Sequence, residues 1–245
     1  GDANEELILT YRVIQKSVKK VISELRILES AYFTRDENER EAFYYEIRDS
    51  FNHELPEINF RTYRPGWAER AAKVIFLNRT CYNGLFRVNR NGEFNVPFGS
   101  YKNPDILNEA NLQDVAQMLK KTRIIQGDFT WCRDYVDDHT FVYFDPPYRP
   151  ISQTSSFTSY SRDGFGEKDQ HRLAALFREL DAKGATIMLS NSDPRNRNYH
   201  DTFFDDLFAG FTIGRAPARR MINCNGTRRG SIDELIVTNY PTKKR

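Results

Sequence analysis

Apolar residues recur at intervals of three and four along the first third of the chain. The clearest stretch runs from Leu7 to Leu28, where positions such as Ile14 and Val21 fall on one helical face. This spacing predicts an amphipathic helix with one buried side. Weaker repeats of the same kind predict further helices over residues 39–53, 66–79 and 109–120.

Between residues 85 and 101 the helical spacing gives way to alternation of apolar and polar residues. The runs Leu-Phe-Arg-Val and Glu-Phe-Asn-Val-Pro flank the tetrapeptide Asn89-Arg90-Asn91-Gly92. An Asn-Gly pair accommodates the positive φ that tight hairpin turns require. The segment therefore predicts a β-hairpin.

From residue 122 onward, short β-branched and aromatic runs alternate with helical patterns. The predicted strands are 123–126, 140–144, 185–190, 211–215 and 234–239, and the predicted helices are 168–180 and 198–208. This alternation is typical of an α/β fold with a mostly parallel sheet covered on both faces. We expect an α/β domain of residues 1–12 and 105–245, interrupted by an inserted helical and hairpin module of residues 13–104.

The composition is that of a globular protein, with 39% hydrophobic and 13% aromatic residues in a chain of 245. No apolar stretch approaches the roughly 20 residues of a membrane span, and no secretory signal opens the sequence, so we expect no membrane and a cytoplasmic location. The three cysteines lie far apart with no histidines at ligand spacing. A disulfide framework or a metal site is therefore not expected.

Charge is informative only through its distribution, since the net charge is +2. Arg79, Arg87 and Arg90 are interleaved with aromatic residues in and beside the predicted hairpin. Such a mixture suits a phosphate-rich partner whose bases can stack. The basic C-terminal stretch is explained equally well as a solvated charged face.

Acidic and amide side chains occupy the predicted strand ends. Asp128 follows one strand, Asp145 follows the next and Ser190-Asn191 ends a third, while Asp2 precedes the first helix. Carboxylates at the carboxyl ends of neighbouring strands can bind ribose hydroxyls, an adenine amine or an ammonium group. Each of these residues could instead cap a helix, and both interpretations remain open at this point.

The tetrapeptide Asp145-Pro146-Pro147-Tyr148 carries the most specific chemistry of the α/β part. Proline cannot donate to a sheet ladder, so the strand 140–144 must end here. A carboxylate and an aromatic ring on a stiff backbone suit a planar amino group, although a proline turn with a capping Asp is the structural alternative. Neither a GxSxG turn nor a Walker-type loop occurs, which argues against a covalent hydrolase or an NTPase.

Together with this tetrapeptide, the segment FLNRTCYNGLFRVNRNGEFNVPFG of residues 76–99 resembles the Dam-type DNA adenine-N6 methyltransferases. Further matches lie at Gly127-Asp128-Phe129, Phe157–Tyr160, Ser190-Asn191 and Asn225–Arg228, so the resemblance covers essentially the whole chain. It implies a Rossmann-like S-adenosylmethionine-dependent methyltransferase sheet with an inserted helical and β-hairpin DNA-recognition domain. Residues 1–12 and 105–245 would be catalytic and residues 13–104 would recognise the target.

The implied reaction moves a methyl group from S-adenosyl-L-methionine to N6 of a flipped adenine in double-stranded DNA, within GATC. The resemblance implies that Asp145 and the Pro146 carbonyl accept hydrogen bonds from the amino group. Pro147 would stiffen the loop and Tyr148 would stack on the base. The residues implied to bind the cofactor are Asp2, Asp128, Phe129 and Asp145, and no metal is implied.

The residues implied to contact DNA lie in and beside the hairpin. Tyr82 and Asn83 would line the gap left by the flipped base, and Leu85, Arg87 and Pro97 would read bases. An arginine such as Arg87 can bind guanine O6 and N7 together. Asn89, Asn95 and Tyr101 would contact or support phosphates. Ser100 stands where some members of the family have an arginine.

Relatives of this kind carry a glycine-rich cofactor loop and a lysine-containing segment before the position that matches Asp2. The printed chain begins at Gly1, so we expect the methionine end of the cofactor to be held upstream of it. A fragment, omitted N-terminal residues and a natural truncation all remain open. The alternatives are therefore a catalytically inactive DNA-binding module and an amino-methyltransferase acting on another substrate, such as RNA or a protein glutamine.

The resemblance also implies a bacterial or phage origin. A cognate restriction endonuclease that shares the site without binding the chain remains open.

Overall fold

The computed structural model describes the chain except for residues 65, 150–164, 220–230 and 243–245. The described residues from Gly1 to Asp128 pack as one compact unit, and those from Phe129 onward pack as a second. We call them the helical unit and the sheet unit and describe each by itself. Compactness does not identify a catalytic domain, so the assignment of residues 1–12 and 105–245 to catalysis stays a prediction.

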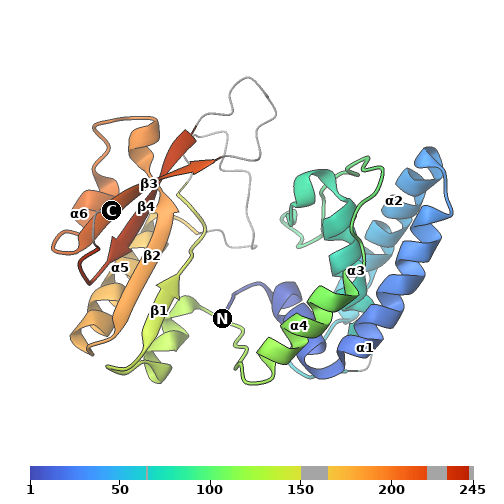
Figure 1. Cartoon of the computed structure of the whole chain (residues 1–245), viewed down its shortest axis with the longest axis horizontal. Coiled ribbons are helices and arrows are strands. Elements are labelled where there is room, and N and C mark those ends of the chain that lie inside the picture. The colour runs from blue at the N-terminus through green and yellow to red at the C-terminus, as the bar shows by residue number, and fades with distance from the viewer. Residues whose placement is uncertain (65, 150–164, 220–230, 243–245) are drawn as a thin grey trace. The chain divides into compact units, whose positions relative to one another are not determined.

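Four α-helices make up most of the helical unit (Figure 1). They are α1 (Glu5–Phe33), α2 (Glu37–His53), α3 (Trp67–Thr80) and α4 (Glu109–Leu119), with short 3-10 turns at Leu55–Glu57 and Tyr82–Gly84. All four predicted helices are confirmed. Asn4 caps α1 by accepting from the backbone N–H groups of Glu6 and Leu7.

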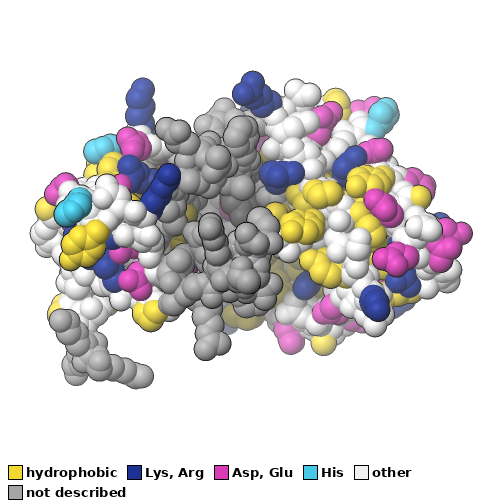
Figure 2. All heavy atoms as spheres, turned by 90° about the horizontal axis from the view of Figure 1, so that it is seen from above, with side chains coloured by type: hydrophobic (Ala, Val, Ile, Leu, Met, Phe, Trp, Pro, Cys, Tyr) yellow, Lys and Arg dark blue, Asp and Glu magenta, His cyan; other side chains and the backbone are white. Residues whose placement is uncertain are grey.

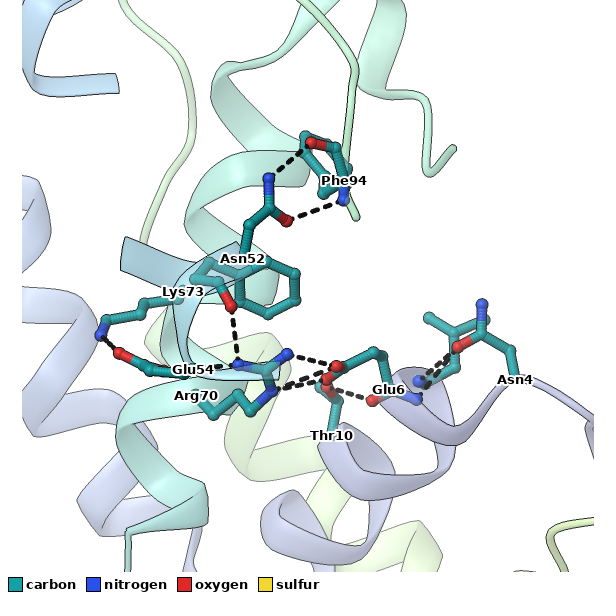
Figure 3. Close-up of polar contacts among 10 residues, drawn as sticks. Asn4, Glu6, Thr10, Asn52, Glu54, Arg70, Lys73 and Phe94 are labelled. Carbon is teal, nitrogen blue, oxygen red and sulfur yellow. Dashed lines mark hydrogen bonds and ion pairs between the residues drawn. The ribbon is translucent and has the colours of Figure 1, made fainter. Parts of the chain in front are cut away.

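A buried polar cluster fixes the start of α1 to α2 and α3 (Figure 3). Arg70, which is 1% exposed, donates from Nε to both carboxylate oxygens of Glu6 at 3.1 and 3.0 Å. Its Nη1 donates to the carbonyl of Phe51 on α2 at 2.9 Å. Glu54 joins this arginine to Lys73. A buried charge is costly when it loses its partners. A shift of one helix would break these pairs, so the cluster fixes the position of the three helices relative to one another.

The predicted hairpin is present at residues 85–99, which we call the hairpin. Val88 bridges Phe94, and the turn closes with Gly92 N–H donating to the Asn89 carbonyl at 2.9 Å. Gly92 has φ +85, and Asn91 is not in the left-handed region. The turn therefore has a three-residue loop that ends in one left-handed glycine.

The sheet unit contains four described strands in the order β1-β2-β4-β3. They are β1 (Phe141–Phe144), β2 (Thr186–Ser192), β3 (Thr212–Arg219) and β4 (Ser231–Thr238). β1 pairs with β2 in parallel, and β4 is antiparallel to both β2 and β3. The prediction of a mostly parallel sheet is therefore wrong for the described strands, because β4 turns back and inserts between β2 and β3.

Two further predictions about elements are wrong. Residues 123–126 form no strand; their only β-contact among the described residues is a parallel bridge between Gln126 and Asp2. The predicted helix 198–208 is reduced to α6 (Phe203–Leu207). Asn198 and Asp201 accept from nearby backbone N–H groups, and this local bonding competes with a longer helix.

The core of the sheet unit lies between the sheet and helix α5 (Glu167–Ala182). Leu173 and Phe177 of α5 pack with Ile187 and Leu189 of β2, and all four side chains are at most 1% exposed. The described part of the unit also has two 3-10 segments, Phe129–Tyr135 and Pro194–Asn196. Because β2 is buried along most of its length, the residues at its end are held rigidly.

Candidate active site

The first cluster of predicted site residues lies where β1 ends in the sheet unit. Asp145 is exposed and directly follows Phe144, the last residue of β1. The Ser190 hydroxyl on β2 donates to Asp145 Oδ1 at 3.1 Å and lies 2.9 Å from the Tyr143 hydroxyl. Since Ser190 has a single proton to donate, it accepts from Tyr143. Asp145 is thus held through one oxygen, and Oδ2 can accept from another group.

A buried pair of amides supports the residues that follow, Asp145–Arg149, which we call the 145–149 loop. Asn191 of β2 is fully buried, and its Oδ1 accepts from the Arg149 backbone N–H at 3.1 Å. Its Nδ2 donates to Gln170 Oε1 at 3.3 Å, and Gln170 donates to the Pro147 carbonyl at 3.3 Å. The loop is therefore fastened on both sides of Tyr148.

The Arg149 side chain fastens the same loop from outside. Its Nη1 donates to Asp201 and its Nη2 to Glu167, both at 2.9 Å, while the guanidinium lies 4.4 Å from the Phe203 ring centre. Partial burial opposes the charge, but these two carboxylates prevail and raise the pKa of Arg149. Gln170 and Arg149 were not predicted as site residues. Gln170 is identified only by its nearness to the tetrapeptide in space, whereas Arg149 directly follows Tyr148 in the sequence.

Tyr148 presents its ring at the end of this loop and is 38% exposed. Partial burial raises the pKa of its hydroxyl. The side chain is therefore a neutral phenol at physiological pH. Pro146 and Pro147 leave no N–H donor between the carboxylate and the ring, so this stretch of backbone can only accept.

Two predicted cofactor carboxylates lie on neighbouring segments of the helical unit. The Asp2 N–H donates to the Ile125 carbonyl at 3.1 Å, and the Gly127 N–H donates to the Asp2 carbonyl at 3.0 Å. This parallel bridge places Asp2 next to the segment that ends in Asp128. Phe129, the first residue of the sheet unit, packs edge-on against Phe165 with ring centres 5.8 Å apart.

The eight residues predicted to contact DNA lie on two paired segments of the helical unit. The Tyr82 N–H donates to the Pro97 carbonyl at 2.8 Å, and the Asn83 N–H donates to the Tyr101 hydroxyl at 3.0 Å. Arg87 donates from Nε to Asn95 Oδ1 at 2.8 Å. The structure therefore brings these residues together, although their contacts with DNA remain predictions. The others are Leu85 and Asn89.

Aromatic and basic groups are accessible on this part of the helical unit. Tyr82 is 46% exposed, Tyr101 is 40% exposed and Arg90 is exposed. Figure 2 shows hydrophobic and basic side chains next to one another on the surface of this unit. Asn89 is engaged within the turn, because its Oδ1 accepts from the Asn91 and Glu93 N–H groups.

The Cys81 thiol lies buried beneath the hairpin and donates to the Leu85 carbonyl at 3.2 Å. Burial raises its pKa to about 11. Gly99 allows the backbone to pass close by, because a Cβ there would lie 2.6 Å from the Cys81 carbonyl oxygen and 2.6 Å from the Tyr101 ring. These contacts set the spacing between the two paired segments.

No cluster of three or more His, Cys, Asp or Glu side chains able to hold a metal ion occurs among the described residues. No helix in the described part of the chain is long and apolar enough to cross a membrane. The matching segments Phe157–Tyr160 and Asn225–Arg228, like much of the basic C-terminal stretch, lie outside the described residues.

Comparison with protein families matches residues 1–222 to the model of the D12 class N6 adenine-specific DNA methyltransferases. The type II methyltransferase M.MjaIII of Methanocaldococcus jannaschii is 48% identical over 98% of this chain and 79% of its own length. The type II methyltransferase M1.LlaDCHI of Lactococcus lactis subsp. cremoris is 37% identical over 98% of this chain and 78% of its own. The DNA adenine methylase of Escherichia coli K12 is 33% identical over 98% of this chain and 78% of its own.

Proposed function

The chain belongs to the D12 class of N6 adenine-specific DNA methyltransferases, and from this membership we propose how its residues carry out the reaction. Adenine-specific methyl transfer to DNA is the activity of the family, and S-adenosyl-L-methionine supplies the methyl group as an electrophilic sulfonium. The observation that carries the proposal is the arrangement of Asp145, Ser190 and Tyr148 at the end of β1.

Asp145 Oδ2 and the Pro146 carbonyl accept the two N6 protons of the adenine. The lone pair of a free adenine amine is delocalised into the ring, and two acceptors favour the pyramidal nitrogen that attack requires. When bound, the cofactor would supply the methyl group to N6 and leave as a neutral thioether, and the amino proton released from N6 would pass to the Asp145 carboxylate and from there to solvent. Positioning the two reacting groups accounts for much of the rate in a reaction of this type.

Ser190 contributes by fixing the orientation of the Asp145 carboxylate through its 3.1 Å hydrogen bond. Tyr148 stacks on the adenine, and its neutral ring presents a sequence-tolerant π face. The base must leave the duplex to reach this loop, because its amino group is inaccessible within the stack. The accessible Tyr82 and the adjacent Asn83 line the gap that it leaves.

The described residues fit the nucleoside end of the cofactor. Asp2 and Asp128 lie on neighbouring parallel segments, and carboxylates there suit ribose hydroxyls and the adenine amine. Phe129 and Asp145 complete the proposed cofactor set. We assign catalysis to residues 1–12 and 105–245, target recognition to residues 13–104, and the place of action to the compartment that holds the DNA, the cytoplasm.

The proposed site sequence is GATC, which the Dam-type resemblance supports. Arg87 reads its guanine with Leu85 and Pro97 beside it, and Asn89, Asn95 and Tyr101 form or support the phosphate contacts. A restriction endonuclease of the same specificity would act on the same DNA without contacting this chain.

Methyl transfer from tritiated S-adenosylmethionine tests the proposal on duplexes with GATC and with the same bases permuted. We expect transfer only with GATC, and Asp145→Ala should abolish it while duplex affinity stays within a few fold. Asp134→Ala, an exposed aspartate of the same unit, serves as the matched control. Turnover by Asp145→Ala near the control rate would refute the role of this carboxylate, and equal transfer to permuted duplexes would refute GATC.

A further inference from the structure

Arg87 of the hairpin donates two hydrogen bonds to one neighbour, Asn95. Its Nε donates to Asn95 Oδ1 at 2.8 Å, and its Nη2 donates to the Asn95 backbone carbonyl at 3.2 Å. Both bonds use the same edge of the guanidinium. The orientation of the planar group is therefore fixed relative to the hairpin backbone.

These two hydrogen bonds leave the outer edge of the guanidinium available for another acceptor. An arginine carries five N–H groups, of which Asn95 takes two, and among the described residues the other three donate to no side chain or carbonyl. Two of those three form the parallel pair on the outer edge. That pair is the one that the O6 and N7 acceptors of a guanine require.

Side chains of helix α2 bind the residues on both sides of Asn95. Asn52 donates to the Phe94 carbonyl at 3.0 Å and accepts from the Phe94 N–H at 2.8 Å (Figure 3). The Tyr44 hydroxyl donates to the Val96 carbonyl at 2.8 Å. Phe94 and Val96 are 2% and 1% exposed, so Asn95 is the outward residue between two anchored ones.

We propose that Asn95 is a positioning residue that sets the base-pair specificity of Arg87. This inference rests on the proposed function, in which Arg87 reads a base, and it goes beyond the phosphate or supporting contact assigned to Asn95 there. A free arginine side chain samples many rotamers and reaches several base edges. An arginine held by Nε and Nη2 on an anchored segment of the hairpin presents its outer pair to one base pair only.

A double-mutant cycle on methylation separates positioning from phosphate contact. The measured quantity is the ratio of kcat/KM for the intact site to kcat/KM for each single-base-pair variant, for wild type, Arg87→Ala, Asn95→Ala and the double variant. We expect Asn95→Ala to lower this ratio by about tenfold or more at the same base pair as Arg87→Ala. The double variant should show no further loss.

Asn95→Asp is the second variant, and it controls for loss of discrimination that results only from a misfolded hairpin. A carboxylate still accepts from Arg87 but repels phosphate, so the discrimination ratio should return to within about threefold of wild type although overall DNA affinity falls. Asn111→Ala, on an exposed position of α4, is the matched control. Loss of discrimination in Asn95→Asp comparable to that in Asn95→Ala would overturn the inference.

The positioning role of Asn95, the base-reading role of Arg87 and the proposed function give different results when they are wrong. If Arg87→Ala relaxes one base pair while Asn95→Ala weakens every sequence equally, Asn95 is a phosphate contact and the positioning role is wrong. If Arg87→Ala leaves every ratio unchanged, the proposed base reader is wrong. If the wild-type chain methylates no duplex at all, the proposed function itself fails.

Discussion

Replacing Asn191 by leucine removes the buried amide that connects β2 to the 145–149 loop. The two side chains are similar in size, so the substitution deletes polar contacts without a large cavity. Three hydrogen bonds are lost, to the Arg149 N–H at 3.1 Å, the Ser192 N–H at 2.9 Å and the side-chain oxygen Oε1 of Gln170 at 3.3 Å. Each former partner is left facing an apolar group.

The magnitude follows from the burial of these partners. An unpaired buried polar group costs about 1–3 kcal/mol, and Arg149 is only partly buried, so we expect the unfolding free energy to fall by about 2–4 kcal/mol. The 145–149 loop also loses the hydrogen bond at Arg149, the residue directly after Tyr148. Misplacement of a reacting group by about 1 Å lowers a rate about 100-fold, and we expect kcat to fall by that order.

Single-turnover methyl transfer at saturating duplex and cofactor measures the rate, and urea unfolding followed by circular dichroism measures the stability. The temperature must lie well below the melting transition, so that every molecule is folded. Asn111→Leu, on the exposed side of α4, should change neither quantity appreciably. A folded Asn191→Leu protein that retains kcat within about twofold would show that Asn191 does not position the loop.

Three further outcomes test other parts of the structure. Tyr148→Phe should keep most of the activity because stacking needs the ring, whereas Tyr148→Ala should lose about tenfold or more; equal losses of kcat in the two variants would contradict a stacking role. Gly99→Ala should lower the unfolding free energy by about 1–3 kcal/mol because the new methyl meets backbone at 2.6 Å, whereas Gly66→Ala, with nothing within 4 Å, serves as the control; equal urea midpoints would contradict this crowding. Because the Cys81 pKa is raised to about 11, the thiol stays protonated at pH 8 and ionises only as the pH approaches that value. Iodoacetamide should therefore modify it slowly in the native state, and rapid labelling seen by mass spectrometry would contradict its burial.

The helices α1 to α4 and the hairpin were predictable because each is encoded by neighbouring residues. The period of apolar residues identifies α1, and Asn4 before it is an ordinary capping residue. Strand 123–126 was not predictable in the same way, since four residues form a strand only when a partner pairs with them. Here the pairing among described residues stops at one bridge to Asp2.

The candidate site was predictable where it consists of a local motif. Asp145 and Tyr148 stand three positions apart on a backbone stiffened by two prolines, and the tetrapeptide alone suggests an acceptor beside a ring. Ser190-Asn191 was recognised as a strand end, but the hydrogen bonds that hold this motif were not predictable, because they join distant parts of the chain. Asn191 binds Arg149 across 42 positions and Gln170 across 21.

The sequence by itself determined the local elements, the acceptor loop and, through its long matching segment, the family. The tertiary structure decided which strands pair, with β4 inserted antiparallel between β2 and β3. It also decided which polar groups support the reactive ones, such as the buried Ser190 for Asp145 and the partly buried Asn95 for Arg87. The physical reason is the same in each case: periodicity and turn chemistry act between neighbours, whereas a buried polar group needs a partner that only the folded chain brings within hydrogen-bonding distance.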